Sequence, residues 1–440
     1  MESPDHIQDV AIIGGGPAGS VAAICCARLG LSVLLLEKQA HPRFHIGESM
    51  LPRGIDLINE LGLADRLKSF PQTRKYGAGF VMADTQDPTL FWFSSTRGGK
   101  PSQAVNIERS TFDRMLLDAA QDEGCDVREG ISVEHIDRLE EGDVSLATSA
   151  GQVRARILLD ASGQATLVAR HLRTRHRIPG MARVAHYAHF AGVERALGHA
   201  AGSPINVMGE EGWFWVIPLD SKRTSVGLVL EPGIANAVGV SADTMLRWGV
   251  ERSPYMRRVM RDARGPIHNI VCADYSYRCD PFAGPGYMLL GDAAMFIDPI
   301  FSAGVCMAME TGRRAAGLVA ELKSNPKRAM HARREYINFL ESSSRPLFNL
   351  VQQYYTHPFR ELMLTSPGPL GIHDAVLSVL AGYVFPRPRL SVRLRLAIMN
   401  VLVKVHARTG KLAPSIDKYS LLNSTTAPAE EIRKLTGAIL

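Results

Sequence analysis

The first forty residues contain the feature that most constrains the fold, a glycine turn between two apolar segments. Residues 9–13 are typical of a short buried strand, and Gly14-Gly-Gly-Pro-Ala-Gly19 follows them directly. Residues 20–29 have helical spacing, residues 32–36 form a second apolar segment, and Glu37 closes the unit. This order of strand, glycine turn, helix, strand and acid predicts a dinucleotide-binding βαβ unit.

The glycines and the acid of this unit each have a physical role. Gly14 permits the tight turn, Gly16 lets the backbone approach a pyrophosphate, and Gly19 lets the helix pack close to the strand. The free N–H groups at the start of the helix attract phosphates. Glu37, at the end of the second strand, is expected to accept a hydrogen bond from a ribose hydroxyl. Ala18 and Lys38, which adjoin these positions, complete the expected cofactor-binding set of the unit.

Composition excludes several other classes of protein. Of the 440 residues, 46% are hydrophobic and 21% are charged, which suits a globular protein with a large core rather than a disordered chain. The net charge of +6 favours anionic ligands without requiring nucleic acid. Six scattered cysteines lack zinc-ligand spacing, so we expect reduced thiols, no metal and a cytoplasmic protein. Neither a secretory signal nor an apolar run of about 18 residues is present, and we expect no membrane contact.

Three distant segments favour FAD over NAD as the dinucleotide. Arg109 precedes an amphipathic stretch, residues 157–160 form a strand before a turn ending at Gly163, and residues 287–290 form a strand ending in Gly291-Asp292 before a predicted helix. An aspartate at such a strand end suits the ribityl hydroxyls of a flavin. Together these segments resemble the FAD-dependent monooxygenase superfamily over about residues 8–320. The ordinary alternatives are a surface charge for Arg109 and a helix cap for Asp292.

A dense aromatic segment narrows the chemistry further. Residues 212–218 read Gly-Trp-Phe-Trp-Val-Ile-Pro, and strand alternation places Trp213, Trp215 and Ile217 on one face. A packed core strand is the alternative. The WxWxIP pattern resembles that of the flavin-dependent halogenases. The resemblance implies that the two tryptophans stand between flavin and substrate, block direct oxygen transfer, and let only a small species pass.

Lys75 matches the lysine of that family by position and context. It follows the Gly47-Glu48-Ser49 loop, which resembles the flavin-side loop of the family, and precedes a short glycine-rich segment. The resemblance implies that Lys75 holds hypohalous acid, either by hydrogen bonding from its ammonium or as a haloamine. Burial, or Arg74 if its side chain is near, would lower the lysine pKa. The alternatives are a surface lysine at 75 and a helix cap at Ser49.

Residues 296–305 are the third element of the resemblance. Ser302, Ala303 and Gly304 are expected to bind halide, chloride or bromide, through backbone amides at a helix start, with Gly304 and Val305 also facing the flavin. Helix capping by Ser302 is a compatible alternative. Tryptophan-type halogenases have a glutamate three residues before this glycine, where this chain has Phe301. The departure resembles the phenol- and pyrrole-directed branch.

The predicted fold class is α/β (α+β overall). We expect a Rossmann-like FAD-binding domain from residues 1–75, 103–185 and 270–325, a β-sheet substrate domain from residues 76–102 and 186–269, and a helical region from 326 to 440. Between Asp374 and Asp417 the chain has seven Lys or Arg residues and no acid, with helical apolar spacing. Such a helix suits an acidic carrier protein, a membrane surface, or simple packing against the enzyme body.

The resemblance implies a halogenase of secondary metabolism that uses FADH2 and O2. It would chlorinate or brominate an electron-rich aromatic such as a phenol or pyrrole, free or bound to an acyl-carrier protein. No second glycine fingerprint is present, which favours a separate NAD(P)H-dependent flavin reductase. The alternatives are a single-component flavin hydroxylase or prenyl reductase of the same fold, and an inactive FAD-binding assembly or carrier-binding protein. The substrate, the regiochemistry, the halide, a covalent flavin link and the oligomeric state stay open.

Overall fold

A computed structural model describes residues 7–85, 87–96, 103–266, 269–273, 276–365 and 371–424. The expectations for residues 1–6, 97–102 and 425–440 therefore lie outside the described residues. In the described part of the chain, no helix is both long and apolar enough to cross a membrane. The same residues contain no cluster of three or more His, Cys, Asp or Glu side chains that could hold a metal ion.

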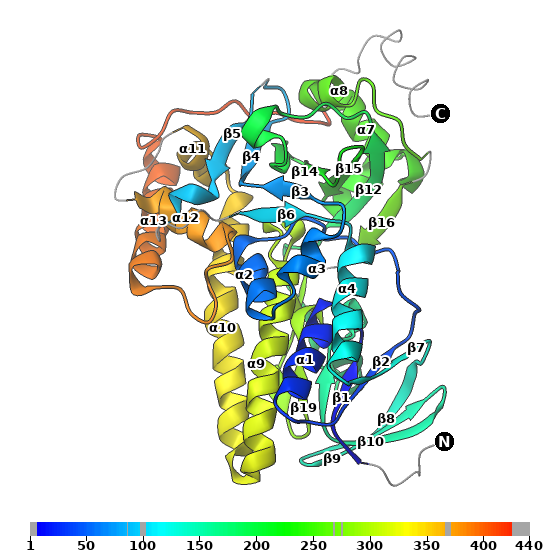
Figure 1. The fold of residues 1–440 in the computed structure, drawn as a ribbon. Helices are drawn as coiled ribbons and strands as arrows, with labels where there is room; N and C mark the ends of the chain where they lie inside the picture. The colour runs from blue at the N-terminus through cyan, green and yellow to red at the C-terminus, as the bar shows by residue number, and fades with distance from the viewer. Residues whose placement is uncertain are drawn as a thin grey trace.

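An eight-stranded sheet in the lower half of the molecule is built on the predicted βαβ unit (Figure 1). Its main path has the order β18-β19-β10-β1-β2-β7, and β19, β10, β1, β2 and β7 pair in parallel. The antiparallel strands β8 and β9 extend it through β10. The strand bounds are β1 Ile7–Ile13, β2 Val33–Glu37, β7 Asp126–Glu129, β8 Val133–Glu140, β9 Asp143–Thr148, β10 Gly151–Asp160, β18 Ala283–Gly284 and β19 Tyr287–Leu289.

Helices α1 (Pro17–Arg28), α4 (Arg109–Asp122) and α9 (Gly304–Ser324) accompany this sheet (Figure 1). Helix α1 begins at Pro17, whose missing N–H costs nothing at a helix start, and its residues are buried almost all round. Helix α9 approaches it closely, because a Cβ on Gly312 would lie 2.4 Å from the carbonyl oxygen of Ala18. Two segments almost 300 residues apart in sequence thus form the wall behind the glycine turn.

A second, seven-stranded sheet lies above the first (Figure 1). Its order is β16-β12-β15-β14-β13-β4-β5, with bounds β4 Gly77–Met82, β5 Thr89–Trp92, β12 Val184–Ala191, β13 Ile205–Met208, β14 Gly212–Pro218, β15 Arg223–Leu230 and β16 Ile270–Ala273. Phe214 and Val216 pack in a core with helices α7 (Met245–Arg252) and α8 (Pro254–Val259). The alternate residues of β14 therefore face the other way, as the sequence pattern predicts.

The C-terminal helices are α10 (Ala329–Tyr354), α11 (His357–Thr365), α12 (Ile372–Leu380) and α13 (Leu390–Thr409). Helix α10 runs beside α9, and α11, α12 and α13 gather beside the upper sheet (Figure 1). The segment after α13 crosses back to the upper sheet, where Glu210 N donates to Tyr419 O at 2.9 Å. The smaller elements are α2 Pro52–Glu60, α3 Ala64–Lys68, β3 Thr73–Lys75, β6 Ala104–Asn106, α5 Leu167–His171, β11 Arg175–Arg177, α6 Pro232–Val238, β17 Tyr277–Cys279 and β20 Met295–Phe296.

Two local expectations differ from the structure. Gly291–Ala293 forms a short 3-10 turn, and the long helix begins only at Gly304. Pro299 and the left-handed backbone of Ser302, with a φ of +54°, interrupt the chain between them. Strand β16 belongs to the upper sheet, although residue 270 is the expected start of the last FAD-domain segment. The division into three domains stays a prediction.

Candidate active site

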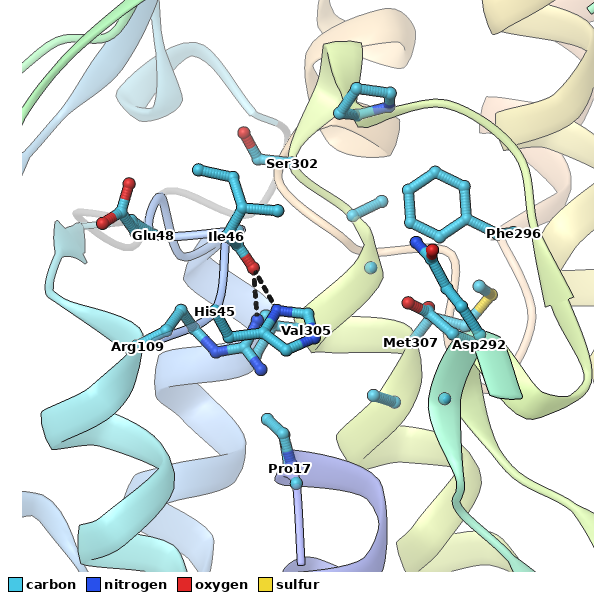
Figure 2. Close-up of a pocket in the computed structure, with 18 of the residues that line it drawn as sticks. Pro17, His45, Ile46, Glu48, Arg109, Asp292, Phe296, Ser302, Val305 and Met307 are labelled. Carbon is cyan, nitrogen blue, oxygen red and sulfur yellow. Dashed lines mark hydrogen bonds between the residues drawn. The ribbon is translucent and has the colours of Figure 1, made fainter. Parts of the chain in front are cut away.

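A cavity of about 810 Å3 joins the two sheets. It extends from the glycine turn past the Gly47–Ser49 loop to Lys75, the tryptophans of β14 and the turn before α9. Figure 2 shows Pro17 at the foot of this space, Arg109 and His45 on one side, and Asp292 and Phe296 on the other. Every predicted site residue except Gly19 lines the cavity: Gly14, Gly16, Ala18, Glu37, Lys38, Ser49, Lys75, Arg109, Trp213, Trp215, Asp292, Ser302, Ala303, Gly304 and Val305.

The glycine turn has the shape that a dinucleotide requires. Gly14 has a φ of +104°, and a Cβ there would lie 2.3 Å from the carbonyl oxygen of Ala161. A Cβ on Gly19 would lie 1.9 Å from the carbonyl oxygen of Gly14, which explains its structural role away from the cavity. At Gly16 the nearest atom is Nη2 of Arg43, at 3.6 Å. The backbone of Gly16 therefore faces open space that a pyrophosphate would fill.

Glu37 supports the turn as well as facing the cavity. Its buried carboxylate accepts from the N–H of Gly15 at 2.7 Å and of Gln39 at 2.9 Å. A carboxylate has further acceptor sites, so a ribose hydroxyl fits beside these bonds. Arg43 lies 3.8 Å from Glu37, and its buried Nε has no hydrogen-bond partner in the described part of the chain. Sequence reasoning missed Arg43, because nothing in the local pattern distinguishes it from a surface arginine.

Arg109 and Asp292 face each other across the cavity (Figure 2). Arg109 is buried, donates to both oxygens of Asp113 at 2.8 and 2.9 Å, and donates to Ile46 O at 2.8 Å. Burial raises the pKa of Asp292 to about 6, and the Arg109 charge opposes this shift. Among the described residues, no protein group is found to donate to the Asp292 carboxylate. The surface-charge and helix-cap alternatives are therefore wrong, and flavin hydroxyls fit the acceptor at Asp292.

The Gly47–Ser49 loop is tied to the upper sheet by a buried ion pair. Oε1 of Glu48 lies 2.7 Å from Nε2 of His189 on β12. Burial opposes protonation of this imidazole, but the Glu48 carboxylate prevails and raises the pKa of His189. The loop is thus held between the sheets. Helix α2 has Leu51 at its N-cap, so capping by Ser49 is wrong.

Lys75 is buried on strand β3, and its side chain is 2% exposed. Its Nζ donates to Oγ of Ser49 at 2.9 Å and to Met50 O at 3.2 Å, and lies 5.3 Å from the centre of the Phe93 ring. Burial alone lowers its pKa to about 7. Arg74 points outward and is exposed, so the expected effect of its charge is absent. Both protonation states of Lys75 are accessible near neutral pH.

The two tryptophans form a continuous aromatic wall. Their ring centres lie 6.0 Å apart, and Trp215 Nε1 donates to Ser225 Oγ at 3.1 Å. Trp213 Nε1 donates to the hydroxyl of Tyr355 at 3.0 Å, and that hydroxyl donates to Oδ2 of Asp298 at 2.8 Å. The packed-core alternative is therefore incomplete, because both rings line the cavity. Sequence reasoning missed Tyr355, which follows α10 and lies far from β14 in sequence.

The turn before α9 places several backbone groups at the cavity. The N-cap of α9 is Ala303 and has no side-chain cap, so capping by Ser302 is wrong. The N–H groups of Gly304 and Val305 belong to the first turn, where a helix offers no internal acceptor. Ser302 and Val305 border the open space in Figure 2. Asp298 accepts from the N–H of Ile300 at 2.9 Å, and burial raises the Asp298 pKa to about 6.

Beyond Lys75, the cavity wall is mainly apolar. Phe93 lies under the amine, and the ring of Phe301, with 7% exposure, packs edge-on against Tyr354. The other apolar residues that line this part are Leu51, Phe80, Phe91, Leu347, Val351, Leu377 and Leu380. They come from β4, β5, α10, α12 and the segments between, which the sequence alone does not bring together. The wall suits a flat, uncharged ring.

Comparison with known proteins agrees with this geometry. A family model described as FAD binding domain matches residues 8–228. The chain is 31% identical to a 1H-pyrrole-2-carbonyl-(peptidyl-carrier protein) brominase of Pseudoalteromonas luteoviolacea, over 86% of this chain and 92% of that one. It is 26% identical to the corresponding chlorinase of Pseudomonas fluorescens, over 80% and 84%. The solved flavin-dependent brominase Bmp2 superposes with a TM-score of 0.80 at 28% identity, over 92% and 100%.

Proposed function

The chain belongs to the flavin-dependent halogenase family, and from this premise we propose that it chlorinates or brominates a pyrrole-2-carbonyl group carried by an acyl-carrier protein. The family consists of enzymes that use reduced FAD. The observation that carries the proposal is Lys75, a lysine buried in the cavity that also contains the glycine turn. A buried amine in an apolar wall has no structural advantage over a leucine, because burial disfavours its charge.

The described residues fit FAD along the whole cavity. Gly14 and Gly16 with Arg43 suit the pyrophosphate, Glu37 suits the adenosine ribose, and Asp292 suits the ribityl hydroxyls. When bound, reduced FAD supplies the two electrons that, with O2, convert halide and a proton into hypohalous acid, water and oxidised FAD. The backbone amides of Ala303 and Gly304 are proposed to hold the halide anion, whereas the N–H of Ser302 donates to Pro299 O at 3.0 Å.

Lys75 is the proposed acceptor of the hypohalous acid. A neutral amine has two hydrogens and one lone pair, and here Ser49 and Met50 accept two hydrogen bonds from Nζ. The lone pair of the nitrogen is left to interact with a ligand in the cavity. In the neutral form the lone pair attacks the halogen of hypohalous acid, the oxygen–halogen bond breaks, and the hydroxide leaves as water with one proton of the amine. Attack by the ring carbon on the halogen then breaks the nitrogen–halogen bond, and the proton lost by the ring restores the neutral amine.

The substrate assignment rests on the apolar wall beyond Lys75. A free pyrrole carboxylate would place a negative charge among Phe80, Phe91, Phe93 and Phe301, at a high desolvation cost. A thioester of the same ring carries no charge. Two relatives are named for pyrrole-2-carbonyl groups on a peptidyl-carrier protein, one as a brominase and one as a chlorinase. The proposal takes this substrate class and leaves the halide to the assay.

Two further parts of the proposal concern the surroundings of the enzyme. A separate NAD(P)H-dependent reductase is proposed to supply the reduced flavin, since the chain has one glycine fingerprint. A cytoplasmic location is also proposed. It is supported by the six cysteines, all free thiols and four of them buried.

The test is product analysis by mass spectrometry. The purified enzyme, FAD, a flavin reductase with NADH, O2 and chloride or bromide are incubated with pyrrole-2-carbonyl carrier protein, free pyrrole-2-carboxylate and a panel of phenols. We expect a halogen isotope pattern on the carrier-bound pyrrole and little on the free acid. Preferential halogenation of a free phenol would contradict the substrate assignment. A product that contains inserted oxygen and no halogen would favour the hydroxylase alternative.

A further inference from the structure

Helix α13 has two unlike faces. Val392, Met399, Val403 and His406 are buried against the enzyme body. The other face is exposed yet apolar: the exposed fractions of Leu394 and Val401 are 56% and 58%. We call this face the α13 stripe and define it as Leu390, Leu394, Ile398, Val401 and Val405.

The stripe is continuous along the helix. With 3.6 residues per turn, its five side chains fall within an arc of roughly 80°. The buried residues lie on the opposite side of the helix, so the stripe does not face the enzyme body. Single exposed leucines are common on protein surfaces, but an aligned row over four turns is typical of an interaction surface.

Basic residues border the stripe on one edge. Arg393, Lys404 and Arg408 are exposed and lie next to the stripe on the helical wheel. No Asp or Glu occurs between Asp374 and Asp417, so no acid on α13 or its flanks compensates these charges. A partner that fits this face has acidic residues around a small apolar patch.

The helix is also firmly placed, close to the catalytic cavity. His406 of α13 lies 2.9 Å from Oε2 of Glu361 on α11, and both side chains are buried. Helix α13 packs on α12, which supplies Leu377 and Leu380 to the cavity wall. Figure 1 shows α13 at the outer edge of this helical group. A partner on the stripe is separated from the cavity by α13 itself and by α12.

We propose that the α13 stripe and its basic edge are the docking surface for an acidic carrier protein that presents the tethered substrate. This inference rests on the proposed function, because it assigns the surface that receives the carrier. Two features favour a protein over a lipid bilayer. The helix contains no Trp, Tyr or Phe, which interfacial membrane helices use as anchors. Its apolar face is also narrow, which suits a small, transient protein contact.

The test compares two kinds of substrate with two kinds of variant. The double variant Arg393→Glu with Lys404→Glu reverses the basic edge, and Leu394→Ser with Val401→Ser removes apolar surface without changing charge. The matched control is Lys222→Glu with Arg261→Glu, two exposed basic residues on the upper half of the molecule. The probes are an acidic peptidyl-carrier protein loaded with pyrrole-2-carbonyl, and a small neutral pyrrole amide that needs no docking.

We expect both stripe variants to raise KM for the loaded carrier roughly tenfold, with KM and kcat for the pyrrole amide unchanged. The control variant is expected to leave all four parameters unchanged. The KM of the wild-type enzyme for the carrier should rise with salt, and this dependence should weaken in the charge-reversed variant. Equal KM values for the carrier in the wild type and both stripe variants would overturn the docking surface.

Other occupants give distinct results. The enzyme can be tested for binding to vesicles of phosphatidylglycerol and phosphatidylcholine. If Leu394→Ser with Val401→Ser abolishes such binding and leaves the KM for the carrier unchanged, the stripe is a membrane-binding surface and not a carrier-docking surface. If the wild type is a dimer and these substitutions convert it to a monomer with an unchanged KM for the carrier, the stripe is an interface between two copies of this chain. Failure of the proposed function appears separately, as no halogenation of the loaded carrier by the wild type. Affinity of the holo-carrier for the stripe variants then still decides the docking question.

Discussion

The two ends of the cavity are built in different ways. At the glycine turn, the backbone of one continuous segment, residues 14–19, forms the proposed pyrophosphate site, and the glycines keep side chains away from it. At Lys75 the site consists of side chains from β3, β14, α10 and the turn before α9, which tertiary packing brings together. A short local sequence pattern is therefore enough to predict a dinucleotide site. A site that must confine a small oxidant depends on packing.

The largest effect is expected at the backbone-built end. Gly14→Ala places a Cβ 2.3 Å from Ala161 O in a left-handed backbone position, so the turn must move, and we expect roughly a 100-fold weaker FAD affinity, about 2.7 kcal/mol. Flavin absorbance of the purified protein and a fluorescence titration measure this loss. Gly317→Ala in α9, where no atom lies within 4 Å, is the control and is expected to bind FAD normally. Normal FAD affinity in Gly14→Ala would contradict the backbone description.

The side-chain-built end is tested by Lys75→Met, which keeps the length of the chain and removes the amine. We expect halogenation to fall by at least ~100-fold while the affinity for FAD stays that of the wild type. Mass spectrometry of the product and a flavin titration measure the two quantities. Because the FAD site and Lys75 belong to the same cavity, this separation of binding from halogenation is the sharpest check on the comparison. Full turnover in the variant would exclude the relay by Lys75.

A smaller effect is expected at Tyr355, which links the tryptophan wall to the turn before α9. Tyr355→Phe leaves Trp213 Nε1 without its acceptor and Asp298 without one donor, a cost of about 1–3 kcal/mol. We expect roughly fivefold more hypohalous acid to escape per halogenated product, with FAD affinity unchanged. A halogen-trapping dione added to the reaction measures the escape. The control is Tyr419→Phe, which removes a hydroxyl that donates to Arg252 O. If equal amounts of hypohalous acid escape from both variants, the Tyr355 hydroxyl does not help to confine the acid.

The last prediction concerns stability rather than activity. Burial lowers the Lys75 pKa from 10.5 to about 7, so the charged form is penalised in the folded state. This penalty is fully present below pH 7 and declines as pH rises from 7 to 10.5, where the amine loses its charge in the folded but not the unfolded chain. Lys75→Met should therefore stabilise the protein at pH 6 by about 2–3 kcal/mol more than at pH 9. Denaturant unfolding at both pH values measures this difference, and a pH-independent effect would contradict the lowered pKa.

The limits of the sequence analysis follow the same division. The βαβ unit and the strand from Gly212 to Pro218 were predictable, because both patterns are contiguous and match a simple period. The helix start at Gly304 was also predictable, but the helix expected directly after Asp292 was wrong, because the structure has a 3-10 turn there. Arg43 and Tyr355 were missed because an isolated arginine or tyrosine has no pattern at all. Their neighbours lie in other segments of the chain.

The sequence by itself determined the dinucleotide-binding unit, through the spacing of its glycines, and its resemblance to the flavin-dependent halogenases implied the cofactor and the kind of chemistry. Only the tertiary structure decided that Lys75 is buried, that its pKa falls without help from Arg74, and that Tyr355 joins Trp213 to Asp298. The physical reason is range: backbone turns depend on neighbouring residues, whereas burial and side-chain hydrogen bonds depend on segments that meet only in the folded chain.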